Sequence, residues 1–414
     1  MKIALIKASH DSDFKQYKKY QASPPQNIFS AAAALSGIAE IAMYDETSYH
    51  KAPVDLDCEM AVIFMSTPDA LRGYQLADLY RRQGKTVILG GLHATFMTEE
   101  ALEHADAVMK GESEALWQGM LDDYKRGKLS SVYQADSPFD LANIGHYPTE
   151  FIRPEIYQGI WSVTVSRGCR FKCRYCTVPR FFREQTYRPI GDIVDEIKRS
   201  GQRSFELKAD NLTSDRDYCL ELFEALAPLN IYWTAETNLR FADDEELLEA
   251  AAESGLWYLL VGLETPSKAG LKEAAKGFNN VHRSAEYIRK LHEYNIVVDS
   301  CMIFGFDEHD RGIFDETWSF IHDVKLDVCH PTIMIPFPGT PLYQDLEQQG
   351  RILTKDWSKY DGNNAVYQPA KMSVEALEAG CYDFTSRYFS MGEMIKRKAS
   401  HTKRFGASMA LSLP

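Results

Sequence analysis

The sequence predicts an α/β protein in three parts, with a linker between the first two. Short apolar runs alternate with helical patterns near the start of the chain, and the same alternation returns after residue 160. Strands that alternate with helices indicate parallel sheets. The 414 residues suffice for two or three domains with sizeable cores. We expect an N-terminal domain, a linker, a partial barrel and a helical extension over residues 1–145, 146–160, 161–340 and 341–414.

Residues 1–145 are predicted to form a Rossmann-like, doubly wound parallel sheet. Strand-like runs occur at Ile3–Ile6, Ile38–Tyr44, Met60–Met65, Thr86–Leu89 and Ala107–Met109. Helical patterns between most of them cover Ile28–Leu35, Ala70–Arg82 and Glu112–Lys125. Helices in these positions would cover both faces of the sheet, so a ligand would bind beyond the carboxyl ends of the strands.

Turn residues gather where the third, fourth and fifth strands of this sheet end. Paired glycines there let the backbone approach a bulky ligand closely. No G-x-G-x-x-G follows the first strand, which disfavours a dinucleotide. A histidine after two glycines satisfies loop hydrogen bonds as often as it touches a ligand. The predicted ligand contacts are Ser66, Thr67, Gly90, Gly91, His93, Gly111 and Glu112.

The linker, residues 146–160, has no clear period and contains Pro148, Pro154 and Gly159. We expect its aromatic side chains to seal the interface between the flanking domains. These are Tyr147, Phe151 and Tyr157, together with Trp161 at the start of the barrel.

Residues 161–340 are predicted to form about six β-α units, fewer than the eight of a closed barrel. Strands are expected near Ser162–Val165, Ser204–Lys208, Tyr232–Glu236, Tyr258–Gly262, Val297–Phe304 and Cys329–Ile335. Helices are expected near Gly191–Ser200, Ser214–Ala227, Asp243–Ser254, Val281–Tyr294 and Phe314–Val324. Polar residues follow the second, third and fourth strands, where barrel enzymes place their chemistry.

A loop after the first barrel strand carries three of the eight cysteines. Cys169, Cys173 and Cys176 have the spacing C-x3-C-x2-C, and Gly168 lets the backbone turn before them. Neighbouring cations favour thiolates, the form that binds metal. These cations are Arg167, Arg170, Lys172 and Arg174. Iron–sulfur clusters usually take four cysteines, so three without a near fourth predict a [4Fe–4S] cluster with one open iron.

This motif resembles the signature of the radical S-adenosylmethionine (SAM) enzymes, with Tyr175 as the aromatic before the third cysteine. The resemblance implies that the open iron chelates the amino and carboxylate groups of SAM. One electron then cleaves SAM to methionine and a 5'-deoxyadenosyl radical. An open six-unit barrel is the fold it implies, and SAM contacts are expected after the strands. The expected contacts are Tyr175, Glu206, Asp210, Asn211, Thr237, Asn238, Arg240, Gly262 and Glu264.

The N-terminal region resembles the cobalamin-binding domain of one radical SAM subclass. The matching segments are Ser23-Pro-Pro25, Gly90-Gly-Leu-His-Ala-Thr95 and Lys110-Gly-Glu-Ser-Glu114. The familiar D-x-H-x-x-G loop is absent: Ala8-Ser-His10 stands in its place, and Asp13 replaces the glycine. The resemblance implies bound cobalamin without a predictable histidine ligand. A cofactor-free platform for a substrate or partner is the alternative.

Composition excludes several other classes of protein. A net charge of −13 argues against nucleic acid as the main partner. No apolar run approaches the roughly 18 residues of a transmembrane segment, and the start of the chain lacks the features of a signal peptide. A cytoplasmic location fits, where cysteines bind metal more often than they form disulfides. The remaining cysteines are scattered, at Cys58, Cys219, Cys301, Cys329 and Cys381.

The C-terminal extension, with helices expected at Leu342–Gly350 and Val374–Lys396, resembles a helical cap beside the substrate. The function implied is cobalamin-dependent methylation of an unactivated carbon or of phosphinate phosphorus. Lipid or natural-product precursors are the implied substrates, and flavodoxin or ferredoxin the implied electron donors. Catalytic residues beyond the cluster are not predicted.

Two alternatives stay open at this point. One keeps the radical chemistry but transfers no methyl group, giving oxidation, cyclisation, carbon–carbon bond formation or rearrangement, with or without cobalamin. The other is a non-catalytic corrinoid- or metal-binding protein whose cysteines hold zinc. A methylthiotransferase is disfavoured, because only Cys58 lies in the N-terminal domain where such enzymes bind a second cluster.

Overall fold

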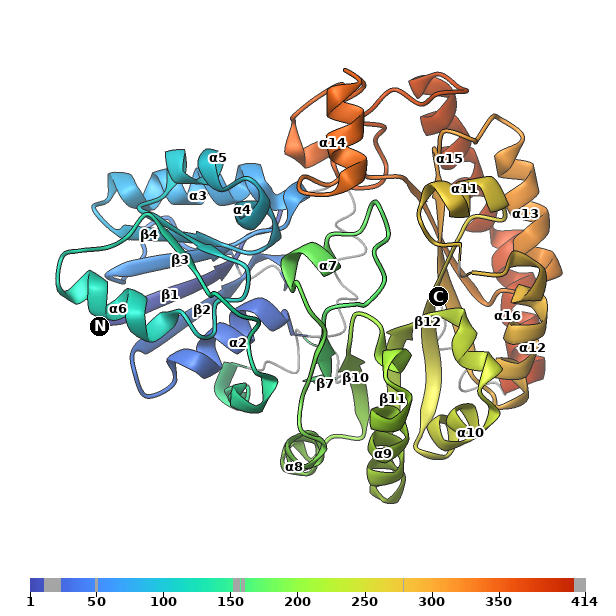
Figure 1. Ribbon diagram of the computed structural model, residues 1–414, viewed down its shortest axis with the longest axis horizontal. Coiled ribbons are helices and arrows are strands. Elements are labelled where there is room, and N and C mark those ends of the chain that lie inside the picture. Colours follow the sequence, from blue (N-terminus) through green and yellow to red (C-terminus); the bar gives the residue numbers. More distant parts are fainter. Residues whose placement is uncertain (11–23, 49–50, 152–156, 158–160, 278, 406–414) are drawn as a thin grey trace.

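The computed structural model describes residues 1–10, 24–48, 51–151, 157, 161–277 and 279–405. Two parallel six-stranded sheets dominate it (Figure 1). The N-terminal sheet has the order β2-β1-β3-β4-β5-β6. Its strands are β1 (Lys2–Lys7), β2 (Glu40–Asp45), β3 (Met60–Phe64), β4 (Thr86–Gly90), β5 (Ala107–Lys110) and β6 (Val132–Gln134). The order reverses between β1 and β3, the switch point at which such sheets bind ligands.

Helices cover both faces of the N-terminal sheet because its buried strands are apolar on both sides. Helices α2 (Gln26–Leu35) and α6 (Trp117–Lys125) pack on one face. The other face is covered by α3 (Ala70–Arg82), α4 (Leu92–Phe96) and α5 (Thr98–His104). Strand β1 contributes to both cores: Ile3 and Leu5 face the first, while Ala4 and Ile6 face the second.

The barrel sheet has the order β14-β13-β12-β11-β10-β7, and all its pairings are parallel. Its strands are β7 (Trp161–Thr164), β10 (Ser204–Lys208), β11 (Tyr232–Thr237), β12 (Leu256–Glu264), β13 (Val297–Phe304) and β14 (Val328–Ile333). A short antiparallel pair, β8 (Ser166–Arg167) with β9 (Thr186–Tyr187), follows β7. The sheet is an open partial barrel of six parallel strands, as predicted.

Helices alternate with the barrel strands. They are α7 (Val178–Phe181), α8 (Ile190–Ser200), α9 (Arg216–Leu226), α10 (Glu245–Glu253), α11 (Lys268–Glu273), α12 (Ser284–Glu293) and α13 (Ile313–Asp323). The extension adds α14 (Pro341–Gln348), α15 (Val374–Tyr388) and α16 (Met391–Phe405). In Figure 1 the short helix α7 lies between the N-terminal sheet and the barrel. No described helix is long and apolar enough to cross a membrane.

Most elements match the prediction to within a few residues, and the differences are informative. The helix predicted to begin at Glu112 begins at Trp117. Glu112 and Glu114 lie in the preceding loop, where both form ion pairs with Arg167 of the barrel. The long helix predicted over Val374–Lys396 is two helices, α15 and α16, separated at Phe389–Ser390. Strand β6 and helices α4 and α5 were not predicted.

The linker aromatics lie largely where we expected them. Tyr147 and Tyr157 are buried and pack against Phe29 of α2. The Tyr147 hydroxyl lies 3.1 Å from the Thr164 hydroxyl of β7, which joins the N-terminal core to the barrel. Pro154 and Gly159 lie outside the described residues, as does Asp13.

Candidate active site

The cysteine loop begins at a turn that only glycine tolerates. Gly168 has a φ of +85°, and a Cβ there would overlap the backbone carbonyl of Glu184. The Gly168 N–H donates to a carboxylate oxygen of Asp210 at 2.7 Å, which ties the loop to the end of β10. The start of the cysteine loop is therefore held in place by the turn at Gly168 and by its hydrogen bond to Asp210.

All three cysteines line a single cavity of about 360 Å³ at the carboxyl ends of the barrel strands. We call it the cysteine cavity. Its walls are largely apolar and include Phe171, Val178, Ile303, Met334 and Phe337. Among the described residues, no three His, Cys, Asp or Glu side chains converge on a single-ion site. The thiols instead surround a shared space, as a multi-iron cluster requires.

The flanking cations do not act on the thiols as we predicted. Burial raises the pKa of Cys169 and Cys173, and it raises that of Cys176 to about 12. Arg167 is committed to two glutamates, and Arg174 to Asp345. Without metal the thiols are held protonated, so the positive charge of bound iron would have to deprotonate them.

The cation that does face the cavity is Lys276, which the sequence did not single out. Its ammonium forms an ion pair with Glu264, and both side chains are mostly buried. Although burial lowers the pKa of Lys276, the Glu264 carboxylate raises it above its ordinary value. Glu264 also accepts a hydrogen bond from Tyr175, and it has a φ of +69°. This positive φ turns the Glu264 carboxylate into the cavity at the end of β12.

Most of the predicted SAM contacts meet at the cysteine cavity. Those that line it are Tyr175, Asp210, Asn211, Thr237, Asn238, Gly262 and Glu264. The Asn211 side-chain oxygen accepts hydrogen bonds from Thr237 at 3.0 Å and from Asn238 at 3.1 Å. These contacts place amide and hydroxyl groups from two strand ends side by side.

Two predicted contacts do not line the cavity. Glu206 points into the lower barrel, where it pairs with Lys208 and accepts a hydrogen bond from Ser162. Arg240 is exposed and lines a separate outer groove. Both residues lie on or just after predicted strands, but Glu206 faces the interior of the barrel away from the cavity, and Arg240 lies outside the cavity.

Two residues outside the predicted set do line the cavity. Glu236 of β11 is open to this cavity, and the partial loss of solvent around its carboxyl raises the pKa of that group to about 7. Cys301 of β13 faces the same space, and burial raises the pKa of its thiol to about 12. Both residues could have been found from the sequence, because inward-facing positions of a barrel strand recur every second residue.

A second cavity, of about 370 Å³, lies between the N-terminal sheet and the barrel. We call it the intersheet cavity. The N-terminal strand ends supply Lys7, Ser66, Gly91, Gly111 and Glu112 to its wall. The barrel supplies Arg167, Thr177, Val178, Phe181, Phe182 and Asp210. Four predicted ligand contacts, namely Ser66, Gly91, Gly111 and Glu112, thus line one space.

The two cavities share part of their walls. Val178 and Asp210 line both of them. Burial raises the pKa of Asp210, against the opposing effects of the Gly168 N–H and of Arg167. A ligand in the intersheet cavity and a ligand in the cysteine cavity would therefore lie on opposite sides of these two side chains.

Three of the predicted N-terminal contacts, Thr67, Gly90 and His93, do not line the intersheet cavity. His93 is fully buried, with its ring nitrogens 3.4 Å from Thr67 and 3.4 Å from Glu100. Its ring also packs edge-on against Trp357 of the extension. The side chain turns away from the strand ends because the core offers it hydrogen-bond partners and aromatic contacts.

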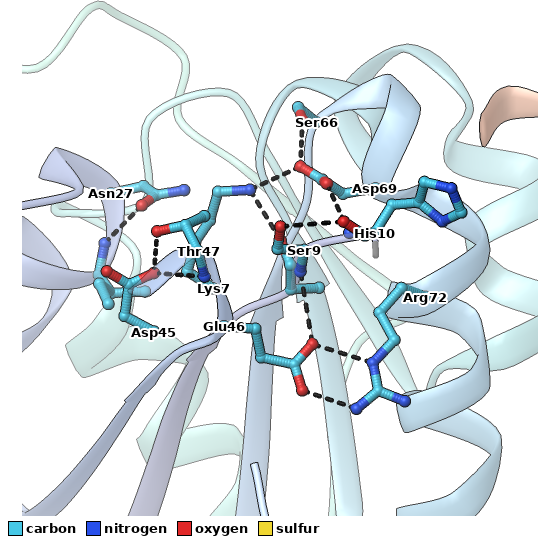
Figure 2. A network of polar contacts seen from close by, with 12 residues as sticks. Lys7, Ser9, His10, Asn27, Asp45, Glu46, Thr47, Ser66, Asp69 and Arg72 are labelled. Carbon is cyan, nitrogen blue, oxygen red and sulfur yellow. Dashed lines mark hydrogen bonds and ion pairs between the residues drawn. The ribbon is translucent and has the colours of Figure 1, made fainter. Parts of the chain in front are cut away.

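Figure 2 shows the polar network at the switch point of the N-terminal sheet. The Lys7 ammonium lies 2.8 Å from a carboxylate oxygen of Asp69, and the backbone N–H of His10 donates to the other oxygen at 2.9 Å. The His10 ring points away from Lys7 in this view. Lys7 lines the intersheet cavity and His10 does not. Among the residues that the structure describes, no histidine lines this cavity.

Comparison with known proteins assigns the barrel. Residues 163–317 match the radical SAM superfamily. This segment of the chain is therefore a radical SAM domain. The chain is 29% identical over 387 residues to bacteriochlorophyllide d C-12(1)-methyltransferase of Chlorobaculum tepidum, covering 91% of this chain and 84% of the relative. It is also 26% identical to the anaerobic magnesium-protoporphyrin IX monomethyl ester cyclase of Cereibacter sphaeroides, over 73% of this chain and 55% of that enzyme.

The same architecture occurs in a solved radical SAM structure. The cobalamin-dependent SAM radical enzyme OxsB, with aqua-cobalamin and SAM bound, aligns with a TM-score of 0.74. The alignment covers 99% of this chain and 70% of that one, at 13% sequence identity. A likeness at this identity shows the fold: a parallel N-terminal sheet, an open barrel and a helical extension in the same arrangement.

The residues present fit the cofactors of this superfamily. Three thiols around one cavity suit a [4Fe–4S] cluster with an open iron. The amide, hydroxyl and carboxylate groups on its rim suit the polar parts of SAM. The intersheet cavity, with glycines at two strand ends and apolar side chains opposite, suits a flat, bulky ligand with a polar edge.

Proposed function

We propose that this chain is a cobalamin-dependent radical SAM methyltransferase that methylates an unactivated carbon of a small organic substrate. The observation that carries the proposal is the shared wall of the two cavities. Of the described residues, Val178 and Asp210 alone line both the space beside the three cysteines and the space beside the N-terminal strand ends. The methyltransferase relative, whose alignment covers 91% of this chain, supports methyl transfer.

The cysteine cavity would bind the cluster and SAM. Cys169, Cys173 and Cys176 would hold three irons, and SAM would occupy the fourth. The Glu264 carboxylate and the amide and hydroxyl groups at Asn211 would hold the ammonium and ribose of SAM by hydrogen bonds. When bound, the cluster and SAM supply the 5'-deoxyadenosyl radical, and cobalamin supplies the methyl group to be transferred.

The intersheet cavity would bind cobalamin between the two sheets. Gly91 and Gly111, with φ of +92° and +80°, keep side chains away from the strand ends. Phe181 and Phe182 face them from helix α7 and the residue after it. Lys7 lines this wall and the His10 ring points away from Lys7, so none of the described histidines would contact the corrin.

The walls of the cysteine cavity also indicate the class of substrate. Leu260, Ile303, Ile333 and Phe337 make it mainly apolar, and Glu236 adds a carboxyl with a pKa of about 7. An apolar molecule with a hydrogen-bond donor near its reacting carbon suits these walls. Because the methyltransferase relative is named for bacteriochlorophyllide d, this tetrapyrrole is the first probe to test.

We place the enzyme in a reducing cytoplasm with a flavodoxin or ferredoxin as electron donor. All eight cysteines are free in the described structure. Free thiols are the usual state of cytoplasmic proteins. A small reductant protein would supply the electron that the cluster needs.

The test is anaerobic turnover of the reconstituted protein with SAM, hydroxocobalamin, a low-potential reductant and bacteriochlorophyllide d. Equal amounts of 5'-deoxyadenosine and S-adenosylhomocysteine, with a methylated product, are expected. The Cys173→Ala variant should form neither nucleoside. Failure of the native protein to bind any corrinoid would refute the cobalamin part of the proposal.

The second candidate is radical chemistry without methyl transfer, such as cyclisation or oxidation. It is favoured by the similarity to the anaerobic cyclase, although this chain spans only 55% of that enzyme. The same assay separates the two candidates: 5'-deoxyadenosine without S-adenosylhomocysteine would indicate the second.

A further inference from the structure

The side chain of Arg167 connects the cysteine loop to the N-terminal sheet. Arg167 stands two residues before Cys169, in the short strand β8. Its guanidinium lies 3.0 Å from Glu112 and 2.7 Å from Glu114. Both glutamates belong to the loop after β5, at the carboxyl edge of the other sheet.

This ion triad is almost completely buried. The exposed fractions of the three side chains are 8% for Arg167, 7% for Glu112 and 5% for Glu114. Glu112 also accepts a hydrogen bond from the backbone N–H of Phe139 at 3.0 Å, and Glu114 accepts one from Ser30. The glutamates are thus held by helix α2 and by the segment after β6, so the position of their loop sets that of the guanidinium.

The planar guanidinium is the group that can satisfy two carboxylates at once. Its several N–H donors spread over a rigid fork, whereas a lysine ammonium is a single compact charge. Arg167 also lies over the ring of Phe182, 6.0 Å from its centroid. Losing the fork would leave buried charge incompletely paired, which is destabilising.

All three members of the triad line the intersheet cavity. The residue after Arg167 is Gly168, which is hydrogen-bonded to Asp210 in the wall shared with the cysteine cavity. A ligand that packs against the triad therefore touches groups that also position the cysteine loop.

We propose that Arg167, through Glu112 and Glu114, is a positioning residue that couples ligand binding in the intersheet cavity to assembly of the cluster. This inference rests on the proposed function for the identity of the ligand, cobalamin. Because coupling is reciprocal, the cluster should tighten corrinoid binding by the same factor by which the corrinoid stabilises the cluster.

The first measurement is the Kd for hydroxocobalamin in cluster-loaded and cluster-free protein, under anaerobic conditions. In the native chain we expect the loaded form to bind at least about 5-fold more tightly. Arg167→Lys keeps the charge but loses the fork, and it should reduce this ratio to below about 2-fold. A native ratio of one would overturn the proposal, as would an unchanged ratio in Arg167→Lys.

The matched control is Arg174→Met. Arg174 lies in the same loop and pairs with Asp345 of α14, but it does not line the intersheet cavity. Arg174→Met should leave the ratio of the two Kd values, for cluster-free and cluster-loaded protein, equal to that of the native chain. Loss of the ratio in this control would mean that any disturbance of the loop abolishes coupling, and would overturn a specific role for Arg167.

The second measurement needs no corrinoid and therefore separates the two proposals. Glu112→Gln changes a residue of the other sheet, yet it should speed release of cluster iron to a chelator by about 5-fold or more. Equal release rates in native and Glu112→Gln protein would overturn the coupling role. If the native chain binds no hydroxocobalamin, the proposed function loses its cobalamin, while iron release still decides the role of the triad.

Discussion

The ion pair between Lys276 and Glu264 offers the sharpest test of the site. The perturbation is Lys276→Met, which removes the ammonium and keeps much of the length of the side chain. It leaves the Glu264 carboxylate in a position where only 7% of its side chain is exposed. The Tyr175 hydroxyl is then its remaining partner.

The size of the effect follows from burial. Two opposite charges about 4 Å apart attract by roughly 4 kcal/mol at an effective dielectric constant of 20. Breaking a buried pair by removing one partner usually costs about 3–5 kcal/mol, because the remaining charge is unpaired. Since both side chains retain slight exposure, we expect Lys276→Met to lower the free energy of unfolding by about 3 kcal/mol.

The assay is a double-mutant cycle by chemical denaturation of cluster-free protein. In the double variant, Lys276→Met with Glu264→Gln, neither charge remains. Its free energy of unfolding should therefore lie within about 1 kcal/mol of the native value. The coupling energy between the two positions should be about 2 kcal/mol or more.

Two results would refute this reasoning. A loss below about 1 kcal/mol for Lys276→Met would mean that the pair is solvated like a surface ion pair. A double variant as unstable as the single one would mean that the lysine stabilises the fold by packing, independently of Glu264.

Further predictions concern pH, cofactor binding and the shared wall. Because the folded state raises the pKa of Glu236 to about 7, the contribution of this carboxyl to stability is present below about pH 4.5 and lost by about pH 8. Glu236→Gln should therefore stabilise the protein by roughly 1 kcal/mol at pH 8, after discounting for solvent in the cavity. A stability difference between the variant and the native protein that does not change with pH would contradict this. Cys173→Ala should lose reconstituted iron, while Cys219→Ala, on the buried face of α9, should retain it. Equal iron contents in the two variants would contradict the cluster assignment. His10→Ala should bind hydroxocobalamin with the native spectrum, and a changed cobalt spectrum would place its ring against the corrin. Val178→Phe should still bind SAM and hydroxocobalamin. It should form at least tenfold less S-adenosylhomocysteine relative to 5'-deoxyadenosine. An unchanged ratio of the two products would show that the methyl group does not pass this side chain.

Much of the site was predictable because its signals are local. The spacing of Cys169, Cys173 and Cys176 places three thiols within one loop whatever the rest of the chain does. Gly168 was identified as a turn residue, and its φ of +85° confirms that turn. The two alternations of strand and helix predicted both parallel sheets, since period and turn chemistry are read within a few residues.

Some predicted contacts turned elsewhere because side-chain direction beyond a strand end depends on packing. His93 follows a strand as predicted, yet it fills the core beneath Trp357. Arg240 follows another strand and lies in solvent. Position in the sequence placed both near a strand end, and neighbours far along the chain decided which way each side chain points.

The sequence by itself thus determined the two parallel sheets, the open barrel and the three-cysteine loop. Only the tertiary structure brought Lys276 to Glu264, set Arg167 between two glutamates of the other sheet, and put Val178 in the wall of two cavities. The physical reason is the distance along the sequence over which each effect acts. Periodicity and turn geometry act over a few residues, whereas buried ion pairs and shared cavity walls form between segments that meet only when the two sheets pack together.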